Sequence, residues 1–68
     1  MYVVMSSEKI EAMRQERGLS RQGLAREAGL AVATVGSVER GERVRVKTAR
    51  SVARVFGMHP KEIGRPAH

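Results

Sequence analysis

Five glycines divide this chain into segments as long as short helices. They stand at positions 18, 29, 41, 57 and 64. Between them the apolar residues recur at helical intervals rather than alternating along the chain. Because glycine readily ends a helix in the left-handed conformation, this punctuation predicts an all-α fold, a compact bundle of five short helices. The expected helices span residues 7–17, 21–28, 32–40, 46–56 and 60–63.

Capping residues and flanking segments complete this picture. Ser20 is expected as the N-cap of the second helix, and His59 followed by Pro60 fits a cap with proline at the first helical position. Residues 2–5 are interpreted as a brief extended arm, and residues 42–45 as a basic connector. The predicted organisation is an N-terminal arm at 1–6, one domain at 7–63 and a flexible basic tail at 64–68.

A chain of 68 residues encloses one small core and needs additional support for stability. It contains no cysteine, so disulfides are excluded, and His59 and His68 are too isolated to suggest a metal site. Well-packed helices, dimerisation or both must supply the support. The apolar arm could pair with its twin in a dimer or pack on its own core, and the sequence leaves both possibilities open.

Positive charge is concentrated in the second half of the chain. The formal net charge is +6; residues 1–30 carry five basic and four acidic groups, whereas residues 31–68 carry eight basic and three acidic groups. A basic half of a folded domain suggests a polyanionic partner. Charge alone also fits a generically basic, soluble surface.

The composition argues against several classes of function. There is no cysteine and no aspartate, and no serine has a histidine placed to activate it. The chain has no paired carboxylates for acid–base chemistry and no phosphate-cradling glycine loop, so we expect a non-enzyme without cofactor, metal or small-molecule ligand. No apolar run approaches the ~20 residues that span a bilayer, and no signal peptide is recognisable. These features predict a cytoplasmic protein without membrane contact.

The spacing of small and apolar residues around Gly29 is typical of a helix-turn-helix. Such a motif needs a small residue where its two helices cross, and Ala25 fills that place. It needs a glycine at the turn, where one residue takes a positive φ, and Gly29 fills that place. Val35 and Val38, six and nine positions further on, would seat the second helix. Its opposite face would then be free to enter a major groove ~12 Å wide.

The chain here resembles the Cro and phage-repressor family of helix-turn-helix proteins (Xre-like) over residues 8–63. The resemblance is carried by Arg14, Gly18-Leu19-Ser20, Leu24-Ala25, Gly29, Val38-Glu39-Arg40-Gly41, Val52-Ala53 and Phe56-Gly57. It implies a lambda-repressor-like bundle in which the second and third helices form the helix-turn-helix and the third helix enters the major groove of double-stranded DNA. It also implies a transcriptional regulator, of the Cro-like repressor type, that forms a weak homodimer on DNA.

The family pattern implies a role for several individual residues. It matches Arg14 and Glu39 to a buried ion pair between the first and third helices. The residues expected to meet base edges are Val32, Ala33, Thr34 and Ser37. Those expected to contact the DNA backbone are Arg21, Gln22, Arg40, Arg43, Arg45 and Lys47.

The third helix departs from the family pattern at its start. Ala31 stands where Ser or Thr usually caps the helix, and Val32 and Ala33 stand where polar residues commonly read bases. An apolar start can contact thymine methyl groups. It can also contact a protein, in which case the chain would be an antitoxin or co-regulator that uses the same fold for protein–protein interaction. Gly36 allows either close approach to a duplex or an adjustment of internal packing.

Overall fold

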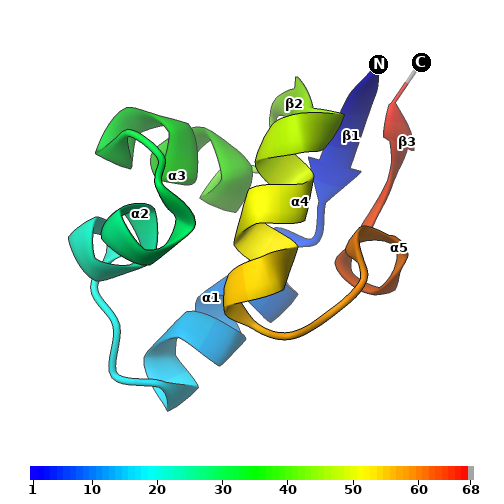
Figure 1. Ribbon diagram of the computed structural model, residues 1–68. Helices are drawn as coiled ribbons and strands as arrows, with labels where there is room; N and C mark the ends of the chain where they lie inside the picture. Colours follow the sequence, from blue (N-terminus) through cyan, green and yellow to red (C-terminus); the bar gives the residue numbers. More distant parts are fainter. Residues whose placement is uncertain (68) are drawn as a thin grey trace.

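The chain folds into five helices and one small sheet (Figure 1). The computed structural model describes residues 1–67. The predicted helices are confirmed, with ends that differ by at most one residue. They are α1 (Ser7–Glu16), α2 (Arg21–Ala28), α3 (Val32–Glu39), α4 (Val46–Val55) and α5 (Pro60–Ile63).

Local hydrogen bonds explain why these helices begin and end where they do. The Ser20 side chain accepts a hydrogen bond from the Gly23 backbone N–H at 3.0 Å, which caps the N-terminus of α2. Gly29 ends α2 in the left-handed conformation, with φ of 71°, and the N–H of Leu30 donates to the Ala25 carbonyl at 2.8 Å. This tight turn sets the direction in which α3 leaves α2.

The structure corrects the all-α expectation, because it contains a three-stranded antiparallel sheet in the order β2-β1-β3. The strands are β1 (Tyr2–Met5), β2 (Arg43–Arg45) and β3 (Gly64–Ala67). Residues 42–45, expected as a connector, therefore contain β2, and residues 64–67 of the expected tail form β3. Residue 68 lies outside the described residues. The physical cause is pairing between distant segments, which satisfies backbone groups that would otherwise need water.

The strand order determines how the N-terminal arm is used. Because β1 lies between β2 and β3, both of its edges are already paired, and Met5 is buried in the core. The arm thus packs on the core of its own chain. Strand β3 forms an outer edge of the sheet. The hydrogen bond from Ser6 N–H to the Ile63 carbonyl shows which residue pairs between β1 and β3 are hydrogen-bonded, because such pairs alternate with non-hydrogen-bonded pairs along an antiparallel ladder. Pro66, opposite Val3, then turns its nitrogen away from β1, where no donor is required.

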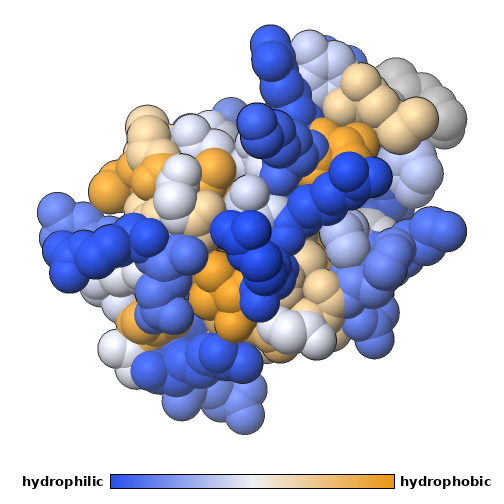
Figure 2. All heavy atoms as spheres, in the orientation of Figure 1, coloured by the Kyte–Doolittle hydropathy of each residue, from blue (hydrophilic) through white to orange (hydrophobic). Residues whose placement is uncertain are grey.

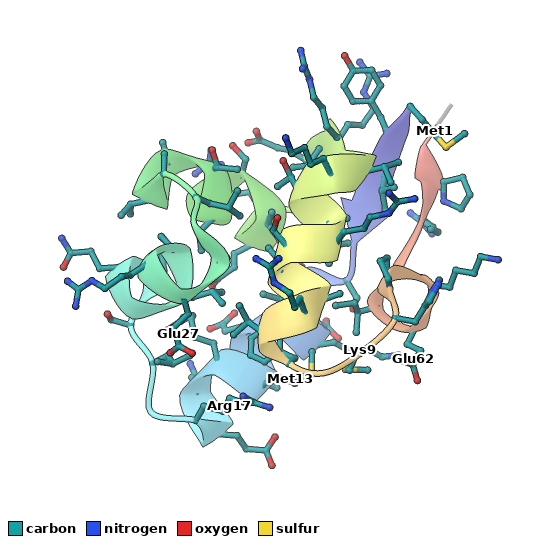
Figure 3. The ribbon with its side chains drawn as sticks, in the orientation of Figure 1. Met1, Lys9, Met13, Arg17, Glu27 and Glu62 are labelled. Atoms are coloured by element: carbon teal, nitrogen blue, oxygen red, sulfur yellow. The ribbon has the colours of Figure 1, made fainter. Side chains whose placement is uncertain are left out.

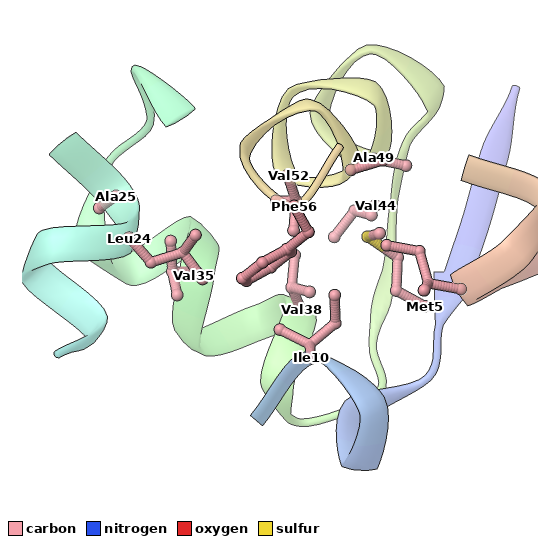
Figure 4. Packing of buried hydrophobic residues seen from close by; sticks show 12 residues of the cluster. Met5, Ile10, Leu24, Ala25, Val35, Val38, Val44, Ala49, Val52 and Phe56 are labelled. Carbon is pink, nitrogen blue, oxygen red and sulfur yellow. The ribbon is translucent and has the colours of Figure 1, made fainter. Parts of the chain in front are cut away.

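A single apolar core joins the helix-turn-helix to the sheet, with α4 between them (Figures 1 and 4). Leu24 of α2, Val35 and Val38 of α3, and Val52 of α4 are fully buried within it. The other buried members of the cluster are Met5, Ile10, Ala25, Val44, Ala49, Ala53, Phe56 and Ile63. One face of α3 is therefore anchored in the core, and the opposite face is available at the surface.

Candidate nucleic-acid interface

The outward face of α3 is small and largely apolar. Val32 is 44% exposed, Ala33 is exposed, and Thr34 and Ser37 are half-buried. The Ser37 hydroxyl donates to the Ala33 carbonyl at 3.3 Å, so part of its hydrogen-bonding capacity is used within the helix. In Figure 2 the surface over α3 is pale to apolar. The four residues expected to meet base edges thus lie along one short helix, and only two of them carry a polar group.

Basic residues lie on the elements next to α3. Arg21 and Gln22 are exposed at the start of α2, and both α2 and β2 contact α3. Arg43 and Arg45 are exposed on β2, and Lys47 is exposed in the first turn of α4. In Figures 2 and 3 hydrophilic side chains project over α4 and around β2 at the top of the view. Exposed cations thus stand on two elements that contact α3 and on the first turn of α4, which follows β2 directly, an arrangement that suits a polyanion.

The sheet adds an aromatic residue that the sequence interpretation missed. The Arg43 guanidinium lies 5.5 Å from the centroid of the Tyr2 ring, within the range of a cation–π interaction. Arg45 is the direct partner of Tyr2 in the strand pairing. The alternation of Arg43, Val44 and Arg45 could have revealed this strand, because it places the valine inward and both arginines outward.

Beneath the surface of α3 lies a partly buried cluster of charged side chains, centred on the buried carboxylate of Glu39. Glu39 accepts hydrogen bonds from Arg14 Nε at 2.9 Å and Arg14 Nη2 at 3.2 Å, and from Arg21 Nε at 3.4 Å. Arg14 Nη1 also donates to the Leu19 carbonyl at 2.9 Å. Within the described residues every buried side-chain nitrogen and oxygen has a hydrogen-bond partner. The cluster ties α1, α2 and α3 together, and it shows that Arg21 contacts Glu39 as well as facing solvent.

A second, exposed cluster lies on the surface at the C-terminal end of α3. Arg40 Nε donates to Glu42 Oε2 at 2.6 Å, and Arg40 Nη2 donates to Ser37 Oγ at 3.3 Å. The hydrogen bond from Arg40 holds the pKa of the Glu42 carboxyl below its usual range. The sequence interpretation expected Arg40 to contact the DNA backbone, and it assigned no role to Glu42. The Arg40-Gly41-Glu42 spacing is its only signal, since the glycine turn brings the two charges together.

Two further properties bear on the choice of partner. Within residues 1–67 no helix has the length and apolarity required to cross a membrane, and α1 and α4, the longest, have ten residues each. The same residues contain no group of three His, Cys, Asp or Glu side chains arranged to hold a metal ion. The exposed chemistry on the α3 side is thus a small apolar helix face with arginines and a lysine on the elements around it.

Comparison with known proteins agrees with this geometry. A helix-turn-helix family model matches residues 10–63, which includes α2, the turn at Gly29 and α3. A search of curated proteins gave no match. The family consists of DNA-binding transcription regulators. Because the match covers well over half of its length, the chain belongs to the Xre/Cro-like helix-turn-helix family.

Proposed function

We propose that this protein is a sequence-specific regulator of transcription that binds double-stranded DNA and acts as a Cro-like repressor. The observation that carries the proposal is the exposed face of α3, anchored from behind by Val35 and Val38 and accompanied by exposed cations on α2, β2 and α4. A helix seated in this way can enter the major groove while the cations neutralise phosphates on either side. Occupying a promoter would then block transcription.

The proposal divides the DNA contacts into two sets. Val32 and Ala33 contact thymine methyl groups, and Thr34 and Ser37 hydrogen-bond to base edges. The residues proposed to contact the DNA backbone are Arg21, Gln22, Arg40, Arg43, Arg45 and Lys47. Since α3 carries few polar groups, most of the affinity comes from the phosphate contacts, and DNA shape contributes to specificity.

The proposal includes a weak homodimer on DNA. Both edges of β1 are paired within the chain, so the contact between copies is assigned to the segment that follows α4. A symmetric dimer of this class places its two recognition helices on half-sites about 34 Å apart. Analytical ultracentrifugation on a selected site tests this expectation. Two chains per site support the dimer, and one chain per site contradicts it.

A salt titration on random and selected duplexes tests DNA binding itself. The logarithm of the affinity should fall linearly with the logarithm of salt, with a slope of about 0.9 per neutralised phosphate. Arg43→Ala should weaken binding to all sequences about equally and lower that slope by about one. Arg54→Ala is the matched control, because Arg54 is exposed on α4 and is assigned no DNA contact. Salt-independent binding, or none at 50 mM salt, would overturn the proposed function.

The exposed apolar start of α3 favours one other candidate. Val32 is one of few large apolar side chains exposed in the described residues, and Ala31 and Ala33 beside it are exposed too. This patch could bind a protein, which would make the chain an antitoxin or co-regulator. Val32→Ser distinguishes the two functions. It should change sequence preference on DNA if α3 reads bases, and it should abolish capture of the partner protein if α3 binds protein.

A further inference from the structure

Arg40 does not extend away from α3 but lies back along its exposed face. Side chains of a helix point toward its N-terminus, so a residue at position 40 covers positions 36 and 37. The structure follows this rule, because Arg40 Nη2 is 3.3 Å from Ser37 Oγ. Arg40 is also in register with the base-facing residues, at intervals of seven from Ala33 and eight from Val32. Its guanidinium therefore occupies the face that is proposed to enter the major groove.

Gly36 makes this position of Arg40 possible. A Cβ atom at Gly36 would lie 3.1 Å from Arg40 Nη1, and apart from its chain neighbours and the backbone of α3 itself it would meet only the Arg40 guanidinium within 4 Å. The glycine is not needed for a positive φ, since it lies in the middle of α3. Nor does it accommodate a neighbouring helix, because only the arginine fills the space. Gly36 thus serves as a recess on the helix surface for a guanidinium group.

Glu42 fixes the direction of the guanidinium and leaves most of it free. Arginine has five N–H donors in a rigid fork. The contacts with Glu42 and Ser37 use Nε and one donor of Nη2. Three donors on Nη1 and Nη2 remain, and the Arg40 side chain is 58% exposed. Two adjacent donors at the end of a fork match the O6 and N7 acceptors of guanine in the major groove.

We propose that Arg40 is a specificity-determining residue that reads one guanine in each half-site, and that Glu42 is the positioning residue that orients it. The inference rests on the proposed function and revises one part of it, since Arg40 is moved from the phosphate contacts to the base contacts. It also supplies what α3 lacks. Arginine at this place gives a largely apolar helix face a bidentate hydrogen-bonding group on its groove-facing side.

The test combines variants of the protein with variants of the DNA. Selection of bound sites from random duplexes identifies the preferred sequence, in which we expect one conserved guanine per half-site. The affinity of the wild type is then measured for that site and for the site with this guanine replaced by adenine. We call the affinity for the guanine site divided by the affinity for the adenine site the guanine ratio. Its expected value is about 5 to 150, the discrimination typical of one bidentate contact. In Arg40→Ala the ratio should collapse to about one.

Matched variants separate base reading from simple charge. Arg43→Ala should weaken binding to both duplexes by the same factor and leave the ratio intact. Glu42→Gln should raise the affinity for random DNA, because it removes a negative charge, yet lower the guanine ratio, because the fork loses its orientation. A merely structural role of Glu42 would change the unfolding free energy and would not move this ratio.

The outcomes keep the two proposals apart. If Arg40→Ala weakens both duplexes equally and lowers the salt slope by about one, Arg40 contacts phosphate, and this inference fails while the proposed function stands. Selected sites without a conserved guanine would also overturn it. If the wild type shows no salt-dependent binding, the proposed function fails, and the reading of guanine fails with it.

Discussion

Two arginine–glutamate pairs lie at the end of α3 in opposite environments, although their glutamates, Glu39 and Glu42, are only three residues apart in sequence. In the first, the side chains of Arg14 and Glu39 are 13% and 1% exposed, and Nε and Oε2 are 2.9 Å apart. In the second, those of Arg40 and Glu42 are 58% and 51% exposed, and the same atom types are 2.6 Å apart. The shorter pair is thus the exposed one, and distance alone does not rank their contributions to stability.

Burial decides what each pair does. The Glu39 carboxylate is buried away from water, so the hydrogen bonds from Arg14 and Arg21 must compensate its lost hydration. The exposed pair keeps its water, and breaking it costs the fold little. The exposed pair instead affects the orientation of the Arg40 guanidinium, which it holds over Gly36. The inner pair fixes the position of α3, and the outer pair fixes what the surface of α3 presents.

The largest expected effect comes from breaking the buried pair. Arg14→Met removes the main partner of Glu39 and leaves only the longer contact with Arg21. The free energy of unfolding should fall by about 3–5 kcal/mol, because an insufficiently compensated carboxylate remains buried. A domain of this size has only about 3–10 kcal/mol in total, so urea unfolding is best followed at low temperature. Arg14→Lys, which keeps the charge but loses the fork, should cost less.

The same exchange at the exposed pair is the control for this comparison. Arg40→Met should leave the unfolding curve close to that of the wild type while it abolishes the preference for guanine. Equal destabilisation by Arg14→Met and Arg40→Met would contradict the division into a structural and a functional pair. Unchanged stability in Arg14→Met would show that Arg21 alone can hold Glu39.

A smaller effect of opposite sign is expected at Gly36. Alanine favours a helix interior over glycine by about 1 kcal/mol, and the added Cβ meets only the flexible end of Arg40. Gly36→Ala should therefore stabilise the protein by up to about 1 kcal/mol in urea unfolding and lower its guanine ratio. A gain in stability with an undiminished guanine ratio would show that the recess at Gly36 is unnecessary for recognition.

The helices could be predicted because their signals are local. Ser20 caps α2 and Gly29 ends it within a few residues of chain, and sequence spacing alone reveals both. The sheet was missed because its pairing joins residue 2 to residues 45 and 67, and no local pattern specifies partners at that distance. Proline also disfavours the interior of a sheet, although Pro66 lies in the edge strand β3, where its missing donor is harmless.

The site was predictable only in part, for a similar reason. The face of α3 follows from helical periodicity, and the Arg14–Glu39 pair came from the family resemblance rather than from spacing. Glu42 was missed because its contact with Arg40 depends on the left-handed turn at Gly41, with φ of 74°. Tyr2 was missed because its neighbour Arg43 is brought to it only by strand pairing.

The smallest expected effect is on the titration of Glu42. Its folded-state pKa is lowered, chiefly by the hydrogen bond from Arg40 and then by the positive charge of Arg40. A lowered pKa means that the pair contributes above the unfolded-state value and is lost as the pH falls through the folded-state value. In an NMR titration of the Glu42 side-chain carboxyl, Arg40→Met should raise the pKa toward its usual range, and Arg54→Met should leave it unchanged. If Arg40→Met does not move this pKa, Glu42 does not hold Arg40 in solution, and its positioning role is lost even if Arg40 itself reads guanine.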